Sequence, residues 1–372
     1  MTVSDPFNVL LLGAGMVNFG TIEGPWCHTT RIENAEQQLG IKRAADVVGY
    51  STSQVFPNIE AAARGLSAES TPHLIIFGIP PNFRGSSLSG SDAELQAQHH
   101  FPRAALFLEK PITSGTAEDA KSVSSLLSSA GTRTSVGYML RYLEATQQMK
   151  RIIQEHNLTV TATIAMYLMA YEFAGTNDRV SYFDLRQEPG PIVSQATHIV
   201  DLCRYLAGSE ADLDTVLAHV LEVSEAPGRL SRCTFESDIP DEFSIPRITD
   251  AIWKWESGAT ATLVHGVALH DGGYDTELTV LADGWKLKLV DPYGTPQLHV
   301  RRPGQEITEV TTYTSDDPFY TEVSSFIDII GDSASDRAVL CSYDDAIATY
   351  ELTWAIRAAG EVSATKRKAK RM

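Results

Sequence analysis

The stretch LLGAGMVN at residues 11–18 follows an apolar run, Phe7–Leu12, and decides how the N-terminal half of the chain should fold. An apolar run that ends in glycines predicts a buried strand and a tight turn. Gly13 would allow that turn, and Gly15 would let the backbone approach a pyrophosphate at a helix N-terminus. Asn18 stands where the third glycine of the G-x-G-x-x-G fingerprint is expected. The stretch therefore predicts a dinucleotide-binding turn with an incomplete fingerprint, and a purely structural turn is the alternative.

Short apolar runs alternate with helical patterns over the first 140 residues. This alternation predicts a doubly wound parallel sheet, and continuous apolar strands suit a sheet that is covered on both faces. The expected strands are Phe7–Leu12, Asp46–Tyr50, Leu74–Ile79, Ala105–Leu108 and Thr134–Gly137, and the expected helices include Ile59–Leu66 and Ala117–Ala130. Residues 1–140 are therefore expected to form a Rossmann domain.

The pattern changes beyond residue 140, where long runs rich in β-branched residues predict a mostly antiparallel sheet. Glu256-Ser257-Gly258 and Ala282-Asp283-Gly284 are expected to be hairpin turns. The expected strands are Thr159–Ala170, Asp214–Glu222, Ala251–Glu256, Ala259–Ala268, Leu278–Ala282 and Trp285–Val290, followed by the helices Phe319–Ile330 and Tyr343–Ala359. The expected fold class is α/β plus α+β, with a second domain over residues 141–372 and the option that a C-terminal helix packs back on the first domain.

The composition describes a globular, acidic chain. Its 372 residues include 30 Lys and Arg against 47 Asp and Glu, a net charge of −17 that argues against nucleic acid as a partner. No apolar run reaches the roughly 18 residues of a membrane span. Four scattered cysteines and a first apolar run without a basic leader predict a cytoplasmic protein with reduced thiols. The histidines predict no metal site, and the basic tail at residues 366–371 is expected to be solvated, with a docking tail as the alternative.

Three further motifs follow expected strands or open a helix. Glu109-Lys110-Pro111 follows the strand at 105–108, GYMLRY at 137–142 follows the next strand, and GPIVSQATHIVD at 190–201 opens a helical pattern. Together with the glycine turn, these motifs resemble the glucose–fructose oxidoreductase / inositol dehydrogenase family (Gfo/Idh/MocA) over nearly the whole chain. The resemblance implies NAD(P)-linked oxidation or reduction of sugars, polyols and related alcohols or carbonyls. It also implies that subunits pair through the exposed face of the C-terminal sheet.

Lys110 is the expected catalytic residue of the first domain. Open α/β sheets bind ligands at the carboxyl ends of their strands, where Lys110 stands. A lysine whose pKa is lowered by desolvation can donate a hydrogen bond to a substrate oxygen, or relay its proton as hydride moves. A solvated surface lysine is the alternative interpretation.

The helix expected over Ile192–Leu206 carries His198, which the resemblance makes a substrate ligand or a second acid–base group. Ser194, His198, Asp201 and Tyr205 would share one face of that helix. The family carries an acid where Ser194 stands, so the Lys–Asp–His proton relay that the resemblance implies is incomplete here. Asp201 could orient His198 instead of binding substrate, and Arg141 could instead join the domains. The expected substrate-binding residues are Arg141, Ser194, Asp201 and Tyr182.

The cofactor residues follow from the glycine turn and the next strand ends. Ser51 and Thr52 stand where an acid would hold the ribose of NAD, and hydroxyl side chains accommodate a 2′-phosphate, so NADP(H) is favoured over NAD(H). Arg84 replaces a family histidine and would meet a phosphate, an acidic substrate or a surface carboxylate. Trp26 and His28 could line the same pocket. The expected cofactor-binding residues are Gly13, Gly15, Met16, Val17, Ser51, Thr52, Ile79, Pro80, Glu109 and Lys110.

Three functions are compatible with these residues. In the first, Lys110 and His198 polarise or protonate the substrate oxygen in a cleft that excludes water, while hydride passes between nicotinamide and the reacting carbon. In the second, which Ser194 and Asn18 motivate, a Rossmann module senses dinucleotide after losing catalytic competence. In the third, the same cofactor assists an elimination. The expected partners are a small-molecule substrate and a second copy of the chain, with no membrane.

Overall fold

The computed structural model describes residues 7–13, 18, 28, 54–170, 180–231, 238–270, 273–331 and 338–371. The chain divides into two compact units. The first contains Met1–Tyr142 and Asp317–Ile347, and the second contains Leu143–Asp316 and Ala348–Met372. The expected boundary at residue 140 therefore differs from the observed one mainly at residues 317–347, which belong to the first unit. Within the described part of the chain, no helix has both the length and the apolarity needed to cross a membrane.

The first unit contains a four-stranded parallel sheet with the order β1-β2-β3-β4. Its inner strands β2 and β3 are wholly buried, which explains why each forms a continuous apolar run. The expected strand Asp46–Tyr50 lies outside the described residues. The strands are β1 (Val9–Leu12), β2 (Leu74–Phe77), β3 (Ala105–Leu108) and β4 (Thr134–Val136). The predicted parallel N-terminal sheet is confirmed.

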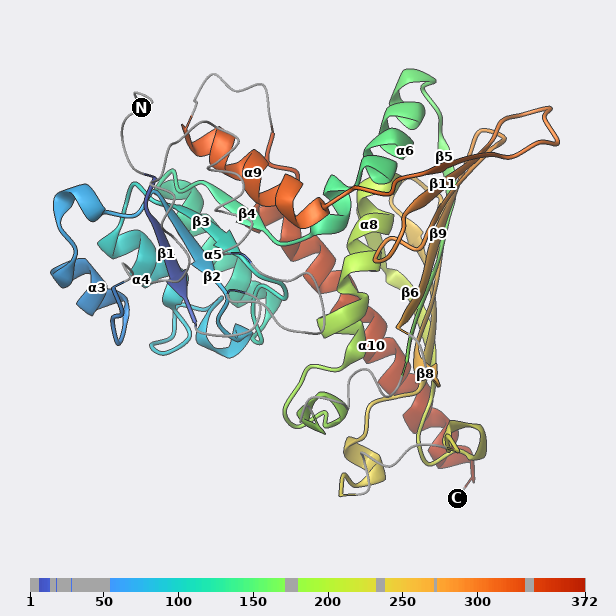
Figure 1. Cartoon of the computed structure of the whole chain (residues 1–372). Helices are drawn as coiled ribbons and strands as arrows, with labels where there is room; N and C mark the ends of the chain where they lie inside the picture. Colours follow the sequence, from blue (N-terminus) through green and yellow to red (C-terminus); the bar gives the residue numbers. More distant parts are fainter. Residues whose placement is uncertain are drawn as a thin grey trace. The chain divides into compact units, whose positions relative to one another are not determined.

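Helices and short turns connect and cover these strands (Figure 1). Helix α5 begins with a capping box, in which Thr116 and Asp119 each bind the other's backbone N–H. Helix α9 packs Val323 and Phe326 into the apolar core around Phe107. The helices are α3 (Ile59–Gly65), α4 (Ala93–His100), α5 (Ala117–Ser129) and α9 (Pro318–Gly331), with 3₁₀ turns η1 (Ala68–Ser70), η2 (Pro81–Phe83) and η3 (Met139–Tyr142).

The second unit is built on an eight-stranded sheet with the order β12-β11-β10-β9-β5-β8-β7-β6. Only β5 and β8 pair in parallel, and both expected hairpins, β7–β8 and β9–β10, are present. The strands are β5 (Val160–Ala170), β6 (Ala211–Leu221), β7 (Ile248–Trp255), β8 (Thr260–Leu269), β9 (Tyr274–Ala282), β10 (Trp285–Val290), β11 (Gln297–Arg301) and β12 (Glu309–Thr312). The predicted, mostly antiparallel sheet is confirmed, with β11 and β12 added.

Helices cover one face of this sheet and leave the other open. Helix α8 contacts β5 and β9, helix α6 contacts β10 and β11, and both lie on the same side of the sheet in Figure 1. On the opposite face, Leu217, Ile252 and Ile164 are 64%, 51% and 45% exposed. Leu217 pairs with Ile252, and both Ile252 and Ile164 pair with Thr262, so these side chains form one row across four strands.

The remaining elements of the second unit follow its sheet. They are α6 (Glu144–Glu155), η4 (Val180–Phe183), a π turn η5 (Ile192–Ala196), α8 (Thr197–Ala207), η6 (Ala226–Gly228), η7 (Asp241–Phe243) and α10 (Tyr343–Arg371), the last of which begins in the first unit. The basic tail is part of α10, and two of its side chains form ion pairs while staying 40% and 56% exposed. Arg367 forms an ion pair with Glu225, and the Lys368 Nζ donates to Glu222 at 2.8 Å.

Candidate active site

The carboxyl ends of three parallel strands lie next to one another in the first unit. Leu12 pairs with Phe77, and Phe77 pairs with Leu108. The residues that follow these strands, starting with Gly13, Gly78 and Glu109, therefore leave the same edge of the sheet. This edge brings together five of the expected residues, namely Gly13, Ile79, Pro80, Glu109 and Lys110. Gly15, Met16, Val17, Ser51 and Thr52 lie outside the described residues.

Gly13 is the turn residue after β1, as expected. Its φ of +95° is a conformation that residues with a side chain rarely adopt. A Cβ built on Gly13 would lie 3.0 Å from the Gly78 carbonyl oxygen and 3.0 Å from the Ile79 Cγ2. Glycine is therefore required here both for the turn and for the close approach of the loop that follows β2.

Asn18, which replaces the third glycine of the fingerprint, is fully buried against the same edge. Its side-chain Nδ2 donates to the Gly13 carbonyl at 2.8 Å and to the Leu12 carbonyl at 3.1 Å. A Cβ on Gly78 would lie only 2.6 Å from the Asn18 amide. The glycine that makes room for close packing is thus on the neighbouring strand end, and the Asn18 side chain fills that space.

Glu109 is held by a histidine that lies far from it in the sequence. The His28 Nε2 lies 2.6 Å from the Glu109 Oε1, and His28 is 3% exposed. Burial alone would raise the pKa of Glu109, but the hydrogen bond and charge of His28, with the charges of Lys110 and Arg84, bring that pKa below its ordinary value. Glu109 is therefore an ionised group. Half-buried Lys110 follows it and is joined to Pro111 by a cis peptide bond.

Arg84 does not lie on the surface, so the surface salt bridge expected for it is wrong, whereas its contact with a phosphate or an acidic substrate stays a prediction. It is 1% exposed, and its guanidinium donates to the Ile79 and Ile112 carbonyls, each at 3.3 Å. These two carbonyls belong to the loops after β2 and β3. Arg84 therefore ties together the two loops that carry Pro80 and Lys110.

Glu94 of α4 is the buried counter-charge of Arg84. It is fully buried, and its Oε2 accepts a hydrogen bond from the Gly85 N–H at 3.0 Å. Burial raises the pKa of Glu94 to about 7, against the opposing charge of Arg84. Glycine is needed at position 85 because a Cβ there would lie 2.3 Å from the Thr113 Cβ.

In the second unit, the segment expected as one helix over Ile192–Leu206 begins with a π turn. The π turn Ile192–Ala196 adds residues to that turn, so Ser194 is not placed as on a regular α-helix before His198. The Ser194 hydroxyl donates to the Gly190 carbonyl at 2.8 Å. His198 and Asp201 both lie on α8, and the face expected to be shared by Ser194 and His198 stays a prediction.

Gln195 is the centre of a buried polar network that the sequence analysis did not single out. Its Oε1 accepts hydrogen bonds from the Tyr182 hydroxyl at 2.9 Å and from the His265 Nε2 at 3.0 Å, and its amide nitrogen contacts Met169. Burial lowers the pKa of His265 to about 3, so this histidine is neutral and donates through Nε2. Gln195 thereby fixes the position of Tyr182, one of the expected substrate-binding residues.

Aromatic rings surround His198 in the same unit. The rings of His198 and Tyr293 lie 6.4 Å apart, and Tyr293 lies 5.5 Å from Tyr167 and 5.1 Å from Tyr274. Burial raises the pKa of Tyr167 and of Tyr293, so both phenols stay protonated. These tyrosines come from three separate segments. The sequence offered no spacing that would have grouped them.

The remaining expected substrate residues have packing contacts. Arg141 is 2% exposed, forms an ion pair with Asp345 at 2.7 Å and donates to the Leu340 carbonyl, all within the first unit. Asp201 is 1% exposed and accepts a hydrogen bond from the Thr349 hydroxyl at 2.8 Å. These contacts hold α10 in both units, and the substrate-binding role of Arg141 and Asp201 stays a prediction.

Comparisons with known proteins give the chain its family. A family model described as "Putative oxidoreductase C terminal domain" matches residues 141–285. The Schizosaccharomyces pombe protein "Uncharacterized protein C12C2.04" is 35% identical over 369 residues, covering 93% of this chain and 95% of that protein.

Solved structures share the fold at low sequence identity. UDP-N-acetylglucosamine 3-dehydrogenase GnnA from Acidithiobacillus ferrooxidans matches with a TM-score of 0.62 at 14% identity, over 96% of this chain and 98% of that chain. The super-repressor mutant of Gal80p from Saccharomyces cerevisiae matches with a TM-score of 0.69 at 12% identity, over 96% of each chain. The parallel sheet, the larger antiparallel sheet and the matched motifs agree with these findings. The 35% identity to the Schizosaccharomyces pombe protein over 93% of this chain shows that the two proteins belong to one family, and residues 141–285 match the oxidoreductase C-terminal domain.

Proposed function

We propose that the protein is an NAD(P)-dependent oxidoreductase that transfers hydride between nicotinamide and an alcohol or carbonyl carbon of a sugar, polyol or related small molecule. The observation that carries this proposal is the edge of the first sheet, where the Gly13 turn, Ile79-Pro80 and Glu109-Lys110 leave three adjacent strands. Open α/β sheets bind their ligands at this edge. The fold that the chain shares with a sugar-nucleotide dehydrogenase supports the same class of reaction.

The residues at this edge fit a dinucleotide. The backbone at Gly13 carries no side chain, and any Cβ there would press against the Gly78 carbonyl. A nicotinamide bound here would supply the site that gives or takes hydride. Ser51 and Thr52 favour NADP(H), because hydroxyl side chains accommodate a 2′-phosphate and no acid stands near them in the sequence.

Lys110 is the residue that we propose moves the proton. Its ammonium would donate to the oxygen of the reacting carbon, and would give up or regain a proton as that oxygen changes between carbonyl and hydroxyl. The ionised Glu109 next to it, paired with His28, places a negative charge beside Lys110.

His198 is the second group that we propose contacts the substrate. It is 9% exposed and faces the ring of Tyr293 at 6.4 Å. Flat aromatic rings beside polar hydrogen-bonding groups suit a sugar or cyclic polyol, whose C–H face is apolar and whose rim carries hydroxyls. Because Ser194 already donates to the Gly190 carbonyl, the proton relay would have to run without the acid of the family.

A panel of alcohols, aldehydes, sugars and polyols, assayed with both oxidised and reduced cofactors, tests this function. Lys110→Ala should lower kcat by at least about a hundredfold, the usual size of a general acid–base contribution, while the affinity for the cofactor stays within about twofold. His198→Ala should lower turnover with the same cofactor affinity. The matched control is Lys121→Ala, which removes an exposed lysine on α5 and should leave turnover unchanged. Unchanged turnover in Lys110→Ala would contradict its role.

A second function, a dinucleotide-binding regulatory protein without turnover, is favoured by one observation. Ser194 replaces the acid of the family and its hydroxyl is engaged by the backbone. The fold shared with a Gal80p repressor mutant is compatible with this function. Saturable cofactor binding without turnover on any substrate of the panel would favour it, and product analysis that reveals loss of water without net cofactor change would favour redox-assisted elimination.

A further inference from the structure

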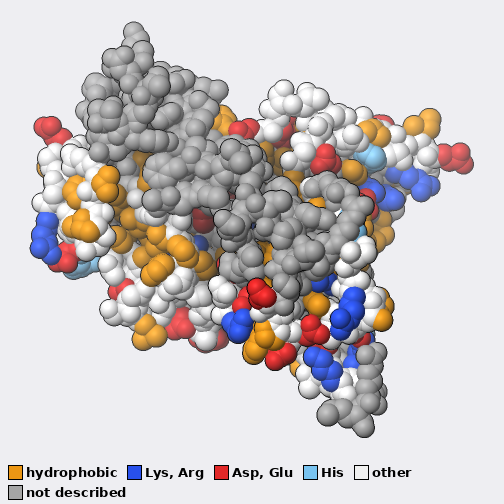
Figure 2. Space-filling model, turned by 60° about the horizontal axis from the view of Figure 1, so that its bottom comes forward, with side chains coloured by type: hydrophobic (Ala, Val, Ile, Leu, Met, Phe, Trp, Pro, Cys, Tyr) orange, Lys and Arg blue, Asp and Glu red, His pale blue; other side chains and the backbone are white. Residues whose placement is uncertain are grey.

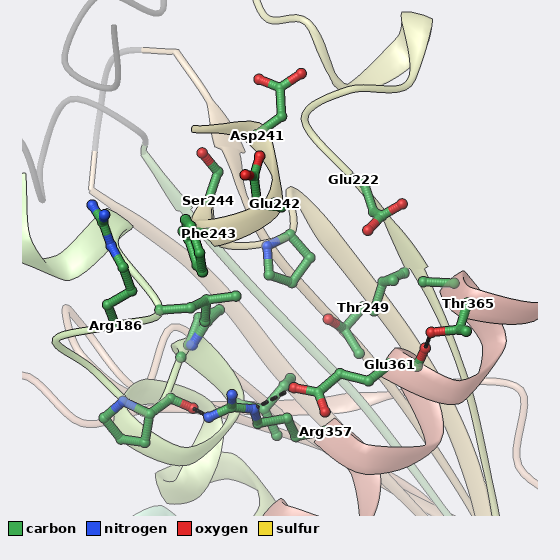
Figure 3. Close-up of a pocket in the computed structure, with 18 of the residues that line it drawn as sticks. Arg186, Glu222, Asp241, Glu242, Phe243, Ser244, Thr249, Arg357, Glu361 and Thr365 are labelled. Atoms are coloured by element: carbon green, nitrogen blue, oxygen red, sulfur yellow. Dashed lines mark hydrogen bonds and ion pairs between the residues drawn. The ribbon is translucent and has the colours of Figure 1, made fainter. Parts of the chain in front are cut away.

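A cavity of about 410 Å³ is lined entirely by residues of the second unit, and of the candidate site it shares only Gly190 and Ile192 before α8. Its walls are the loop that leads into the π turn, the ends of β6 and β7, the turn η7 with the residues after it, and one face of α10 (Figure 3). Arg357, Glu361, Ala364, Thr365 and Lys368 form the α10 wall, because their spacing puts them on one side of the helix. Neither His198 nor the Gln195 network lines this cavity.

Four of the charged groups of the lining form two ion pairs with one another, and Arg186, Asp241 and Glu242 also line the cavity. The Arg357 Nε donates to the Glu361 Oε1 at 2.8 Å, and the Arg357 Nη1 donates to the Pro189 carbonyl at 2.7 Å. The Lys368 Nζ donates to the Glu222 Oε1 at 2.8 Å. Each pair thus presents a fixed donor beside a fixed acceptor, and no described residue binds the second oxygen of Glu361 or Glu222.

Thr249 supplies a hydroxyl to the same space. The residue is 2% exposed, and its hydroxyl oxygen points into the cavity in Figure 3. A hydroxyl at this wall can donate a hydrogen bond to a bound molecule or accept one from it.

Phe243 and Pro246 give the cavity an apolar side. The Arg186 guanidinium lies 4.8 Å from the centre of the Phe243 ring, so this ring is held in place by a cation–π contact. A wall of this kind accepts the C–H face of a small ring, while the ion pairs and Thr249 lie around it.

We propose that this cavity binds a neutral, polyhydroxylated small molecule of about the size of a monosaccharide. A hydroxyl both donates and accepts, so it can bridge the donor and the acceptor of an ion pair without separating them. A cation would have to compete with Arg357 and Lys368, whereas an anion would meet the carboxylates of Glu222 and Glu361. Figure 2 shows acidic and basic side chains interspersed over the coloured part of its face, which is also unsuited to selecting one sign of charge. The volume lies within the usual range of ligand pockets, about 300–1,000 Å³.

The test is a binding titration of the full chain without cofactor, with D-glucose as the neutral probe and with putrescine and succinate as charged probes. Ligand-observed NMR measures the dissociation constants. Thr249→Val keeps the shape of a strand residue and removes one hydrogen bond, so it should weaken glucose binding about fivefold. Ala364→Trp fills the cavity and should abolish that binding. Thr260→Val, an exposed threonine of β8 outside the cavity, should leave it unchanged.

Lys110→Ala separates this cavity from the proposed catalytic edge. Glucose binding that persists in Lys110→Ala and falls in Thr249→Val supports the cavity, whether or not the chain proves to be an oxidoreductase. Three results would each overturn the proposal: no saturable glucose binding, binding that Thr249→Val and a folded Ala364→Trp leave unchanged, or tighter binding of putrescine or succinate in the cavity. If Ala364→Trp does not fold, as judged by circular dichroism, Thr249→Val alone decides.

Discussion

At the residue scale, Glu94 and Arg84 form a buried pair behind the proposed catalytic edge. Arg84 binds the carbonyls of two loops, and Glu94 binds the Gly85 N–H next to Arg84. Burial lowers the pKa of Arg84 and raises that of Glu94, so each residue would be costly without the other. The pair therefore holds the loops of Ile79 and Ile112 in place. Because Glu94 can ionise, the pair also makes the stability of the fold depend on pH.

The pH dependence of stability tests this pair. The pKa of Glu94 is about 7 in the folded chain and 4.5 ordinarily. Because the pKa of Glu94 is higher in the folded chain than in the unfolded chain, protonated Glu94 stabilises the fold. This stabilisation is complete below pH 4.5 and is lost as the pH rises through 7. The shift corresponds to about 3 kcal/mol of unfolding free energy. Urea denaturation at a series of pH values should show this decline in the wild type and a flatter profile in Glu94→Gln.

The control is Glu118→Gln on α5, whose carboxylate is 80% exposed and should not alter the profile. Parallel profiles for the wild type and Glu94→Gln would contradict the shifted pKa.

Single residues also show the limit of what the sequence could predict about the site. Gly13, Glu109 and Lys110 were identifiable because each directly follows an apolar strand. The role of Gly78, which makes room for the Asn18 side chain, was not identifiable from the sequence. It depends on a contact between two segments that lie about sixty residues apart in the chain. The role of Gln195 was not predictable, because the polar groups that it binds include His265, which lies far away in the sequence.

At the element scale, the π turn before α8 is the feature of this helix that the sequence did not predict. Hydrophobic periodicity predicted the existence and the extent of this helix, but a π turn leaves no pattern that differs from an ordinary α-helix. The short strands β11 and β12 were also missed, although β11 alternates between buried and less buried residues. β12 is exposed along its whole length and so carries no alternation of buried and exposed residues.

Helix α9 completes the core of the first unit although it lies near the end of the sequence. Phe326 is 1% exposed and packs with Phe107 and Ile76. Phe326→Ala should lower the free energy of unfolding of this unit by about 3–5 kcal/mol, because a large cavity would replace the ring. Chemical denaturation, followed by circular dichroism, measures the change. Ser325→Ala, the neighbouring and less buried position, should cost less than about 1 kcal/mol, and an equally small effect of Phe326→Ala would contradict the packing.

At the scale of the whole molecule, the open face of the eight-stranded sheet gives a prediction about assembly. Leu217, Ile252 and Ile164 form an exposed apolar row, and such a surface is typical of a face that another protein covers. We propose that a second copy of the chain covers it. Light scattering after size-exclusion chromatography should show an oligomer for the wild type and a monomer for the double variant Leu217→Lys, Ile252→Lys.

Leu88→Lys changes an exposed leucine of the first unit, 68% exposed, and should leave the oligomer intact. A monomeric wild type, or a double variant that still associates, would contradict this assembly.

The two sheets were predictable from the sequence, whereas the division of the chain was not. Buried parallel strands and long β-branched runs have patterns that differ from one another, so both sheets were expected with nearly correct strands. Residues 317–347 follow the second sheet in sequence and return to the first unit through the packing of Val323 and Phe326. The return of a C-terminal helix was expected as an option, but the chain order did not give the bounds of the returning segment.

The central claim, that the first unit binds a nicotinamide dinucleotide, is tested most directly by fluorescence titration with NADPH and NADH. The wild type should give a saturable change in the fluorescence of the reduced nicotinamide, with tighter binding of NADPH. Gly13→Val should lose that change, because its φ of +95° and its contact with the Gly78 carbonyl exclude a side chain. Absence of any saturable change with either cofactor in the folded wild type would contradict the account.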